Sequence, residues 1–390
     1  MKTNSSKPLY RNSNLQIIFL ITLMAVLGVS SITPAFPKIA KVFEISSEKV
    51  GLLIIVFTLP GIILSPIFGI LADRFGRKRV LIPSLILFGI AGTLSAFTRT
   101  FELLLLFRFL QGIGAASIGS INVTLLGDIF EGKERAAAMG YNASVLSIAT
   151  ATYPFIGGLL ANYNWYLPFF LPAFSIPIAL IVLTKLKNPE PKKDGSLKVY
   201  LHNAFNSLKN KEAILYFTAS LITFIILYGC YLTYIPIYLD ELFNAQPFMI
   251  GILLSTMSIT TAVVSSQLKK LSSKFNIKSL FKISFLIYGS ALFLIPFIKI
   301  YALLFIPIII YGIAHGMNIP LVQTLLANIS PLEYRGAFMS MNGMILRGGQ
   351  TLGPLLTGIF YTFYGINSVF FFGGIISILF SILLFIKLSK

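Results

Sequence analysis

Apolar runs of about 20 residues recur from one end of this chain to the other, and they limit the folds that it can adopt. Each run is long enough to cross the hydrocarbon core of a bilayer, roughly 30 Å thick, as an α-helix. With 56% hydrophobic and 11% charged residues among 390, the composition does not fit a soluble fold of this length. We therefore predict an all-α membrane protein with twelve transmembrane helices, expected at residues 15–36, 48–72, 80–98, 102–127, 136–161, 164–186, 213–238, 248–268, 279–298, 301–327, 336–361 and 365–387.

The lysines and arginines fall mainly on one side of these predicted spans. With a cytoplasmic N-terminus, only five of the 31 lie on the outer side, namely Lys38, Lys41, Lys49, Arg99 and Lys299. This asymmetry follows the positive-inside rule, so both termini of a multi-pass cell-membrane protein are expected in the cytoplasm. The net charge of +18 therefore indicates membrane topology and not a nucleic-acid partner. The first apolar run lacks a cleavage site, and we expect it to remain as a span.

The chain divides into two similar halves. A segment rich in charge, Pro and Gly at residues 187–212 predicts a cytoplasmic linker between a six-helix N-terminal half, residues 1–186, and a six-helix C-terminal half, residues 213–390. At a constant offset of 200, residues 101–160 match residues 301–360 at fifteen positions, whereas composition bias would give about five. Because six is an even number of spans, the halves form a parallel repeat, which is expected to enclose a central site.

A charged loop interrupts the apolar sequence at residues 69–80, GILADRFGRKRV, and a weaker copy follows at residues 269–280, KKLSSKFNIKSL. The first copy resembles the loop between helices 2 and 3 of the major facilitator superfamily. Two further stretches, RFLQGIGAA at residues 108–116 and LGVSSITPAFP at residues 27–37, are similar to motifs of its drug:proton antiporter branch. The resemblance implies the major facilitator fold, transport by alternating access and a small-solute substrate.

The charged loop has two possible roles. In the family, its acid contacts the N-terminal end of a helix in the other half, where the helix dipole favours negative charge. The resemblance thus implies a conformational latch on the cytoplasmic side, made by Gly69, Asp73, Arg74, Gly76, Arg77 and Lys78. The alternative is a cluster that only anchors a tight turn at the membrane surface. The second copy has Ser273 and Asn276 in place of Asp73 and Gly76, so only the first copy can form a complete latch.

Two arginines lie inside the predicted spans, although all thirteen Asp and Glu lie in loops or at span ends. An intramembrane charge is expensive, so Arg108 and Arg347 should face a wet cavity, backbone carbonyls or a substrate. For each of them, a structural arginine bonded to helix carbonyls is the alternative. Arg347 is expected near the membrane midplane, and Ser147 stands at its equivalent position in the first half. We expect Arg347 to bind an anionic group of the substrate through its planar fork.

Other polar side chains share helix faces with these arginines. The predicted substrate cavity comprises Arg108, Gln111, Asn122, Tyr231, Tyr234, His315, Asn318, Arg347 and Gln350. Packing is the alternative role for the tyrosines, and His315 either relays a proton or forms a simple hydrogen bond. Asn142 and Asn342 make either interhelical hydrogen bonds or substrate contacts. Close helix packing is expected at Pro154, Gly157, Gly158, Gly353, Pro354 and Gly358.

These features predict a monomeric secondary active transporter that exports an amphipathic organic solute or drug, coupled to a proton or another ion. An anionic or zwitterionic solute is favoured, because no acid lies at mid-depth to pair with a cation. Uptake of an organic anion and a transport-dead membrane receptor are the alternatives. The sequence contains no GxxxxGK[ST] phosphate-binding loop and no constellation typical of an enzyme or a metal site, and its one cysteine is Cys230. We therefore expect no catalytic activity, cofactor or metal.

Overall fold

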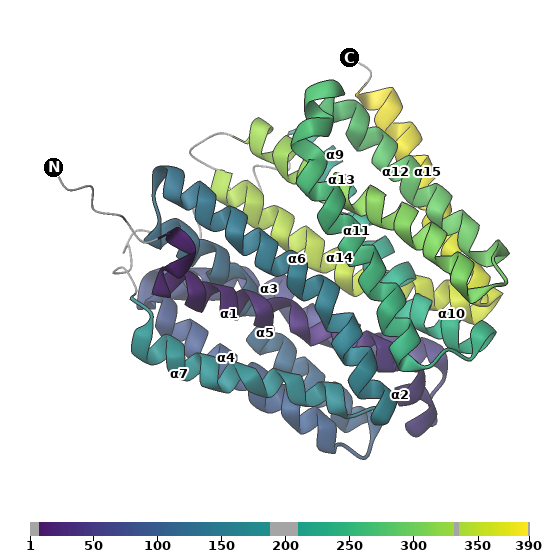
Figure 1. Ribbon diagram of the computed structural model, residues 1–390, viewed down its shortest axis with the longest axis horizontal. Helices are drawn as coiled ribbons and strands as arrows, with labels where there is room; N and C mark the ends of the chain where they lie inside the picture. The colour runs from purple at the N-terminus through teal and green to yellow at the C-terminus, as the bar shows by residue number, and fades with distance from the viewer. Residues whose placement is uncertain (1–7, 188–209, 331–334, 389–390) are drawn as a thin grey trace.

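The computed structural model describes residues 8–187, 210–330 and 335–388, which form helices throughout and contain no β-strand (Figure 1). In these ranges, eleven helices are long and apolar enough to cross a membrane. The twelfth predicted span corresponds to α14 (Arg335–Tyr364), whose 30 residues are long enough to cross but include several polar side chains. The prediction of an all-helical membrane protein is confirmed. The predicted linker lies almost wholly outside the described residues.

The N-terminal half contains α1 (Ser13–Ser30), α2 (Phe36–Val42), α3 (Leu52–Phe75), α4 (Arg77–Leu94), α5 (Phe101–Ile129), α6 (Gly132–Tyr163) and α7 (Ser175–Lys185). The first span passes from α1 to α2 through a 3-10 turn, η2 (Thr33–Ala35), near Pro34 and Pro37. Proline lacks the backbone N–H that continues an α-helix, so the pitch changes there. For the same reason, the sixth span begins as a 3-10 helix, η5 (Leu167–Phe174), that contains two prolines.

The C-terminal half contains α9 (Lys211–Ile225), α10 (Tyr234–Phe243), α11 (Pro247–Lys274), α12 (Ile277–Leu294), α13 (Phe305–Ile329), α14 and α15 (Ile366–Lys387). A π-helical segment, η7 (Ile226–Thr233), joins α9 to α10 inside the seventh span. A π-helix widens the backbone by one residue per hydrogen-bonded ring and is uncommon outside functional regions. The apolar run that predicted one continuous helix therefore contains a change of pitch.

Each half has its own hydrophobic core, and contacts in one half recur in the other. In the N-terminal half, the Ser65 hydroxyl in α3 donates to the Ala116 carbonyl in α5 at 2.9 Å. In the C-terminal half, the Ser265 hydroxyl in α11 donates to the Gly316 carbonyl in α13, also at 2.9 Å. Both pairs are related by the 200-residue offset, so the repeat seen in the sequence is also a repeat of three-dimensional structure.

The halves meet through two equivalent helix pairs, α3 with α14 and α6 with α11 (Figure 1). Gly158 in α6 lies against the Pro247 carbonyl, and Gly251 in α11 lies against the Pro154 carbonyl. A Cβ atom at either glycine would overlap those carbonyls, so the backbones approach closely only because both residues are glycine. The short helices α2 and α10 also meet at this end of the molecule, at the lower right of Figure 1.

Toward the opposite end, which carries the chain termini, the halves separate. On α6, the face that touches α11 at Pro154 continues at helical spacing through Ser147, Ala143 and Gly140, and the last two of these are exposed. Nothing lies within 4 Å of the position that a Cβ would take at Gly140 or at Gly343 in α14. The structure is therefore closed at one end and open at the end of the termini.

Candidate functional site

The three cavity residues predicted in the N-terminal half lie inside the core of that half. Arg108 is fully buried: its Nε donates to the Leu53 carbonyl at 3.3 Å, and its Nη1 donates to Gln111 Oε1 at 2.6 Å. The guanidinium also lies 4.2 Å from the centre of the Phe57 ring. Asn122 Nδ2 donates to Thr22 Oγ1 in α1 at 2.7 Å. These contacts match the alternative role considered for Arg108, a structural arginine bonded to a helix carbonyl.

The aromatic residues predicted in the C-terminal half form a buried cluster. The Tyr231 hydroxyl donates to the Leu254 carbonyl at 3.2 Å, and its ring stacks on Tyr311 with centroids 5.1 Å apart. The Tyr234 hydroxyl is buried and has no hydrogen-bond partner among the described residues. Both tyrosines therefore pack in the helix core, and Tyr234 leaves one polar atom unsatisfied.

His315 and Asn318, both in α13, bond to side chains of neighbouring helices. The Tyr288 hydroxyl in α12 lies 2.5 Å from His315 Nδ1, and the His315 side chain is half-buried. Asn318 accepts a hydrogen bond from Thr223 at 2.9 Å and donates one to Ser284 at 3.0 Å. Asn318 thus ties three helices of one half together, while His315 keeps one ring nitrogen for another partner.

Arg347 and Gln350 differ from the other seven predicted residues in their position between the halves. Both belong to α14 at the junction of the halves, and no described residue forms a hydrogen bond or ion pair with either side chain. The Arg347 guanidinium lies against Gly61 of α3 and Gly119 of α5, which both belong to the other half. One helical turn away, Thr351 shares a hydrogen bond of 2.8 Å with Thr58 of α3. The guanidinium therefore lies beside the contacts that close one end of the space between the halves.

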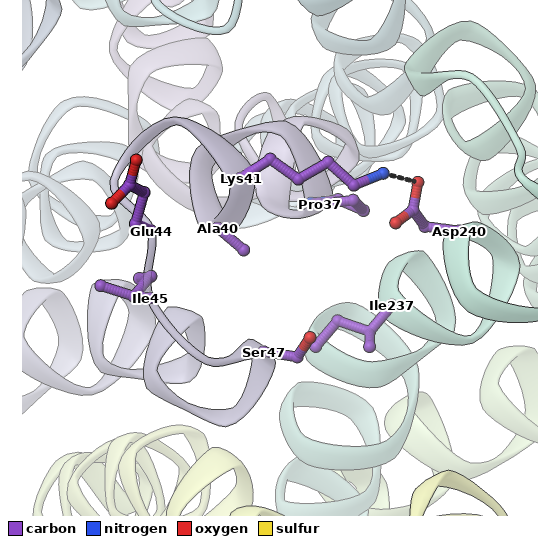
Figure 2. Close-up of a pocket in the computed structure, with 8 residues that line it drawn as sticks. All are labelled: Pro37, Ala40, Lys41, Glu44, Ile45, Ser47, Ile237 and Asp240. Carbon is purple, nitrogen blue, oxygen red and sulfur yellow. Dashed lines mark hydrogen bonds and ion pairs between the residues drawn. The ribbon is translucent and has the colours of Figure 1, made fainter.

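Among the described residues, one ion pair joins the halves, and it lies at the closed end. Lys41 Nζ of α2 lies 2.7 Å from Asp240 Oδ1 of α10 (Figure 2). The pair borders a cavity of about 250 Å³ lined also by Glu44, Ser47 and Ile237 among others. This cavity lies at the closed end, and its lining includes neither Arg347 nor any other residue of the predicted substrate cavity.

The charged-loop residues lie together at the open end. Asp73 forms an ion pair with Arg77, and Arg77 Nε also donates to Asp128 Oδ2 at 3.0 Å. These three residues belong to the N-terminal half, and no described ion pair or hydrogen bond joins Asp73 to the C-terminal half. The latch is therefore not engaged in this open arrangement, and its role stays a prediction. Arg74 lies over the Phe75 ring at 5.5 Å.

The glycines of the charged loop have different environments. Gly76 has φ 101°, a region that favours glycine, and it lets α4 begin directly after α3 ends. Gly69 has open space where a Cβ would lie, so no neighbouring backbone approaches this glycine closely in this arrangement. Lys78 Nζ donates to the Leu183 carbonyl at 3.1 Å near the end of α7. The loop therefore also fastens the turn, as the alternative role requires.

Most of the predicted packing residues make close backbone contacts. Gly157 lies against the Ser31 carbonyl, and Gly353 lies against the Ile225 carbonyl of α9, with no room for a Cβ at either glycine. Pro154 and Pro354 contact Gly251 and Gly51, respectively, across the two halves. Gly358 is packed less tightly, with the Tyr234 hydroxyl 3.3 Å from its Cβ position.

Asn142 and Asn342 accept equivalent hydrogen bonds from the first helix of each half. Asn142 accepts from Thr22 at 2.5 Å, and Asn342 accepts from Ser220 at 2.6 Å. Thr22 and Ser220 lie at nearly equivalent positions of the repeat, as Asn142 and Asn342 do. These bonds are interhelical, which is one of the two roles considered for both residues.

Sequence reasoning predicted close packing at Pro154, Gly158 and Pro354, but it missed other contacts that join the halves. Gly61 and Gly119, which accommodate Arg347, are two among 30 glycines and carry no signal of their own. The Lys41–Asp240 pair had a usable signal, because the repeat places opposite charges at equivalent helix ends in the two halves. Among the described residues, no three His, Cys, Asp or Glu side chains are arranged to hold a metal ion.

Known proteins resemble this chain in sequence or in fold. The sequence model of the Major Facilitator Superfamily matches residues 18–244 and again residues 238–390. Multidrug resistance protein 1 of Bacillus subtilis is 27% identical over 369 residues, which cover 94% of each chain. The class B tetracycline resistance protein of Escherichia coli is 26% identical over 364 residues, covering 90% of this chain and 89% of its own. The crystal structure of the nucleoside transporter NupG has a similar fold, with a TM-score of 0.79 at 18% identity over 97% of this chain and 100% of that one.

Proposed function

The chain belongs to the major facilitator superfamily, and we propose that it is a secondary active exporter of an amphipathic organic solute. It is a multi-pass membrane transporter and not an enzyme. The observation that carries the proposal is the pair of equivalent halves, in contact at one end and apart at the other, with an unpaired arginine between them. Such halves expose a central site to one side of the membrane at a time when they rock about it.

The relatives and the distribution of charges support export. Two relatives that align with most of this chain are named for resistance to several drugs or to tetracycline. The positive-inside rule favours a cytoplasmic location for the termini, and with them for the open end. The described arrangement is then the inward-open state, ready to take up a solute from the cytoplasm or the inner leaflet.

Coupling to a proton requires a group that titrates inside the membrane. No Asp or Glu lies in the described helices away from their terminal turns. His315 is half-buried and shares a hydrogen bond with the Tyr288 hydroxyl through Nδ1, and an imidazole is a side chain that can gain and lose a proton. His315 is therefore our candidate for the coupling residue, and the Tyr288 hydroxyl orients its ring.

The coupling role predicts different effects on driven and undriven transport. In proteoliposomes, His315→Gln should abolish the accumulation of tetracycline, a quinolone or carboxyfluorescein that an imposed pH gradient drives. Exchange of the same probe without a gradient should continue, because the path through the protein is intact. His202→Gln changes the only other histidine and serves as the matched control. Equal gradient-driven accumulation by His315→Gln and the unmodified protein would remove His315 from the coupling mechanism.

The same vesicles test the proposed function itself. Export predicts that a pH gradient moves a probe from the side of the termini to the opposite side. Net movement of an anionic probe in the other direction would support an uptake carrier for organic anions. Binding without flux of any probe would support a membrane receptor that has lost transport.

A further inference from the structure

We infer that the transported solute carries an anionic group, a carboxylate, sulfonate or phosphate, which Arg347 binds in a cradle formed by the two halves together. This inference rests on the proposed function, since it names the solute class of the same central site. Neither half contains the whole cradle: the charge comes from α14, and the surface against which it lies comes from α3 and α5.

No described residue neutralises the charge of Arg347. The four ion pairs among the described residues lie at helix ends, and none includes Arg347. Its guanidinium donates no hydrogen bond to a described residue, in contrast to Arg108, whose donors reach a carbonyl and an amide. An unpaired cation at membrane depth is costly, so the site favours a solute that brings an anionic group to it.

Two glycines of the opposite half make room for the guanidinium. A Cβ at Gly61 would lie 2.6 Å from Arg347 Nη1 and 2.8 Å from Cδ, so any larger residue would displace the side chain. A Cβ at Gly119 would lie 3.3 Å from Nη2. The guanidinium is thus positioned between two helices of the partner half, where its planar fork can bind two oxygens of one anionic group.

Other groups around the cradle suit a polar ligand. Gln350 lies one turn from Arg347 on α14, with an amide that no described residue pairs. Tyr228 of η7 lies near the guanidinium. Together they offer donors and an acceptor beside the cation, and no carboxylate competes with the bound anion. A cationic solute would find like charge and no acid at this depth.

The test compares ligands that share one apolar body. Purified full-length protein in detergent is titrated with naphthalene-2-sulfonate, 2-naphthoate, neutral 2-naphthamide and the 2-naphthyltrimethylammonium cation, and binding is read from the thermal shift. The two anions should stabilise the protein, while the amide and the cation should not. Arg347→Gln should weaken anion binding by about tenfold to a hundredfold, the range expected for losing charge-assisted hydrogen bonds. Arg347→Lys should recover only part of the affinity, because an ammonium lacks the fork.

A second variant tests the cradle without touching the charge. Gly61→Ala should weaken anion binding by displacing the guanidinium, while Gly140→Ala, whose Cβ meets nothing within 4 Å, should leave it unchanged. The inference is wrong if the cation or the amide binds as well as the anions, if no anion binds, or if Arg347→Gln folds and binds anions normally. Transport of a probe that persists in Arg347→Gln would contradict the anion cradle and leave the proposed exporter standing. Binding of the anions without transport of any probe would support the anion cradle and contradict the proposed exporter.

Discussion

At the scale of single residues, the two arginines within the membrane illustrate how one residue type takes two roles. Arg108 is surrounded by groups of its own half that accept its hydrogen bonds or face its charge. Arg347 lies between the halves with no such partner. The depth of both could be predicted, because residues along a span can be counted. Their partners could not, because they depend on which carbonyl of a neighbouring helix comes within reach when the helices pack.

This contrast predicts opposite effects on stability. Arg108→Ala should lower the free energy of unfolding by about 2–4 kcal/mol, because it leaves Gln111 and the Leu53 carbonyl without their buried partner. Arg347→Ala should change it little, since no described group loses a hydrogen bond. Thermal unfolding of both variants in the same detergent measures the difference. Equal destabilisation by the two changes would show that Arg347 is structural, and the anion cradle would then lose its basis.

At the scale of the elements, the repeat was the most informative signal in the sequence. The 200-residue offset relates the bond between Ser65 and Ala116 to the bond between Ser265 and Gly316, so aligned residues take equivalent places. The π-helical segment η7 left no such signal, because an apolar run that is buried all round reads the same at any helical pitch. Hydrophobicity thus locates a span and does not describe its backbone.

The two copies of the charged loop predict an asymmetry between the halves. If Asp73 closes the cytoplasmic side, Asp73→Asn should favour the open state by up to about fivefold, the effect of one charge at a helix end. Cysteines placed at the inner ends of α5 and α13 should then react faster with a membrane-impermeant maleimide, and transport should slow. Ser273→Ala is the matched control, because that copy carries no acid. Equal effects of the two changes would contradict an asymmetric latch.

At the scale of the whole molecule, the sequence could predict two halves but not the state in which they lie. Glycines, threonines and one ion pair among the described residues make the contacts at the closed end. The two partners of each contact lie almost 200 residues or more apart in the sequence, except in the α6–α11 pair. Nothing in a single sequence ranks the open and closed arrangements, because both use the same helices and differ by a few contacts. A transporter needs these arrangements to be close in free energy, so weak contacts at each end suit the function.

The Lys41–Asp240 pair is such a contact, and its removal should favour opening of the outer end. The Lys41 side chain is 66% exposed and that of Asp240 is 22% exposed, so the pair contributes the modest energy of a surface ion pair. Asp240→Asn should raise the outward-open population by about two- to fivefold. Spin labels at Phe97 and Phe297, exposed equivalents at the outer ends of the halves, report the change as longer distances. Cys230, the only cysteine, is fully buried, so labels react with the introduced cysteines.

Two controls separate this attraction from other effects. Lys299→Gln, which removes an exposed charge, should have no effect. Exchanging the pair as Lys41→Asp with Asp240→Lys should restore the original distances. If the exchanged pair stays open, the closure does not depend on this attraction.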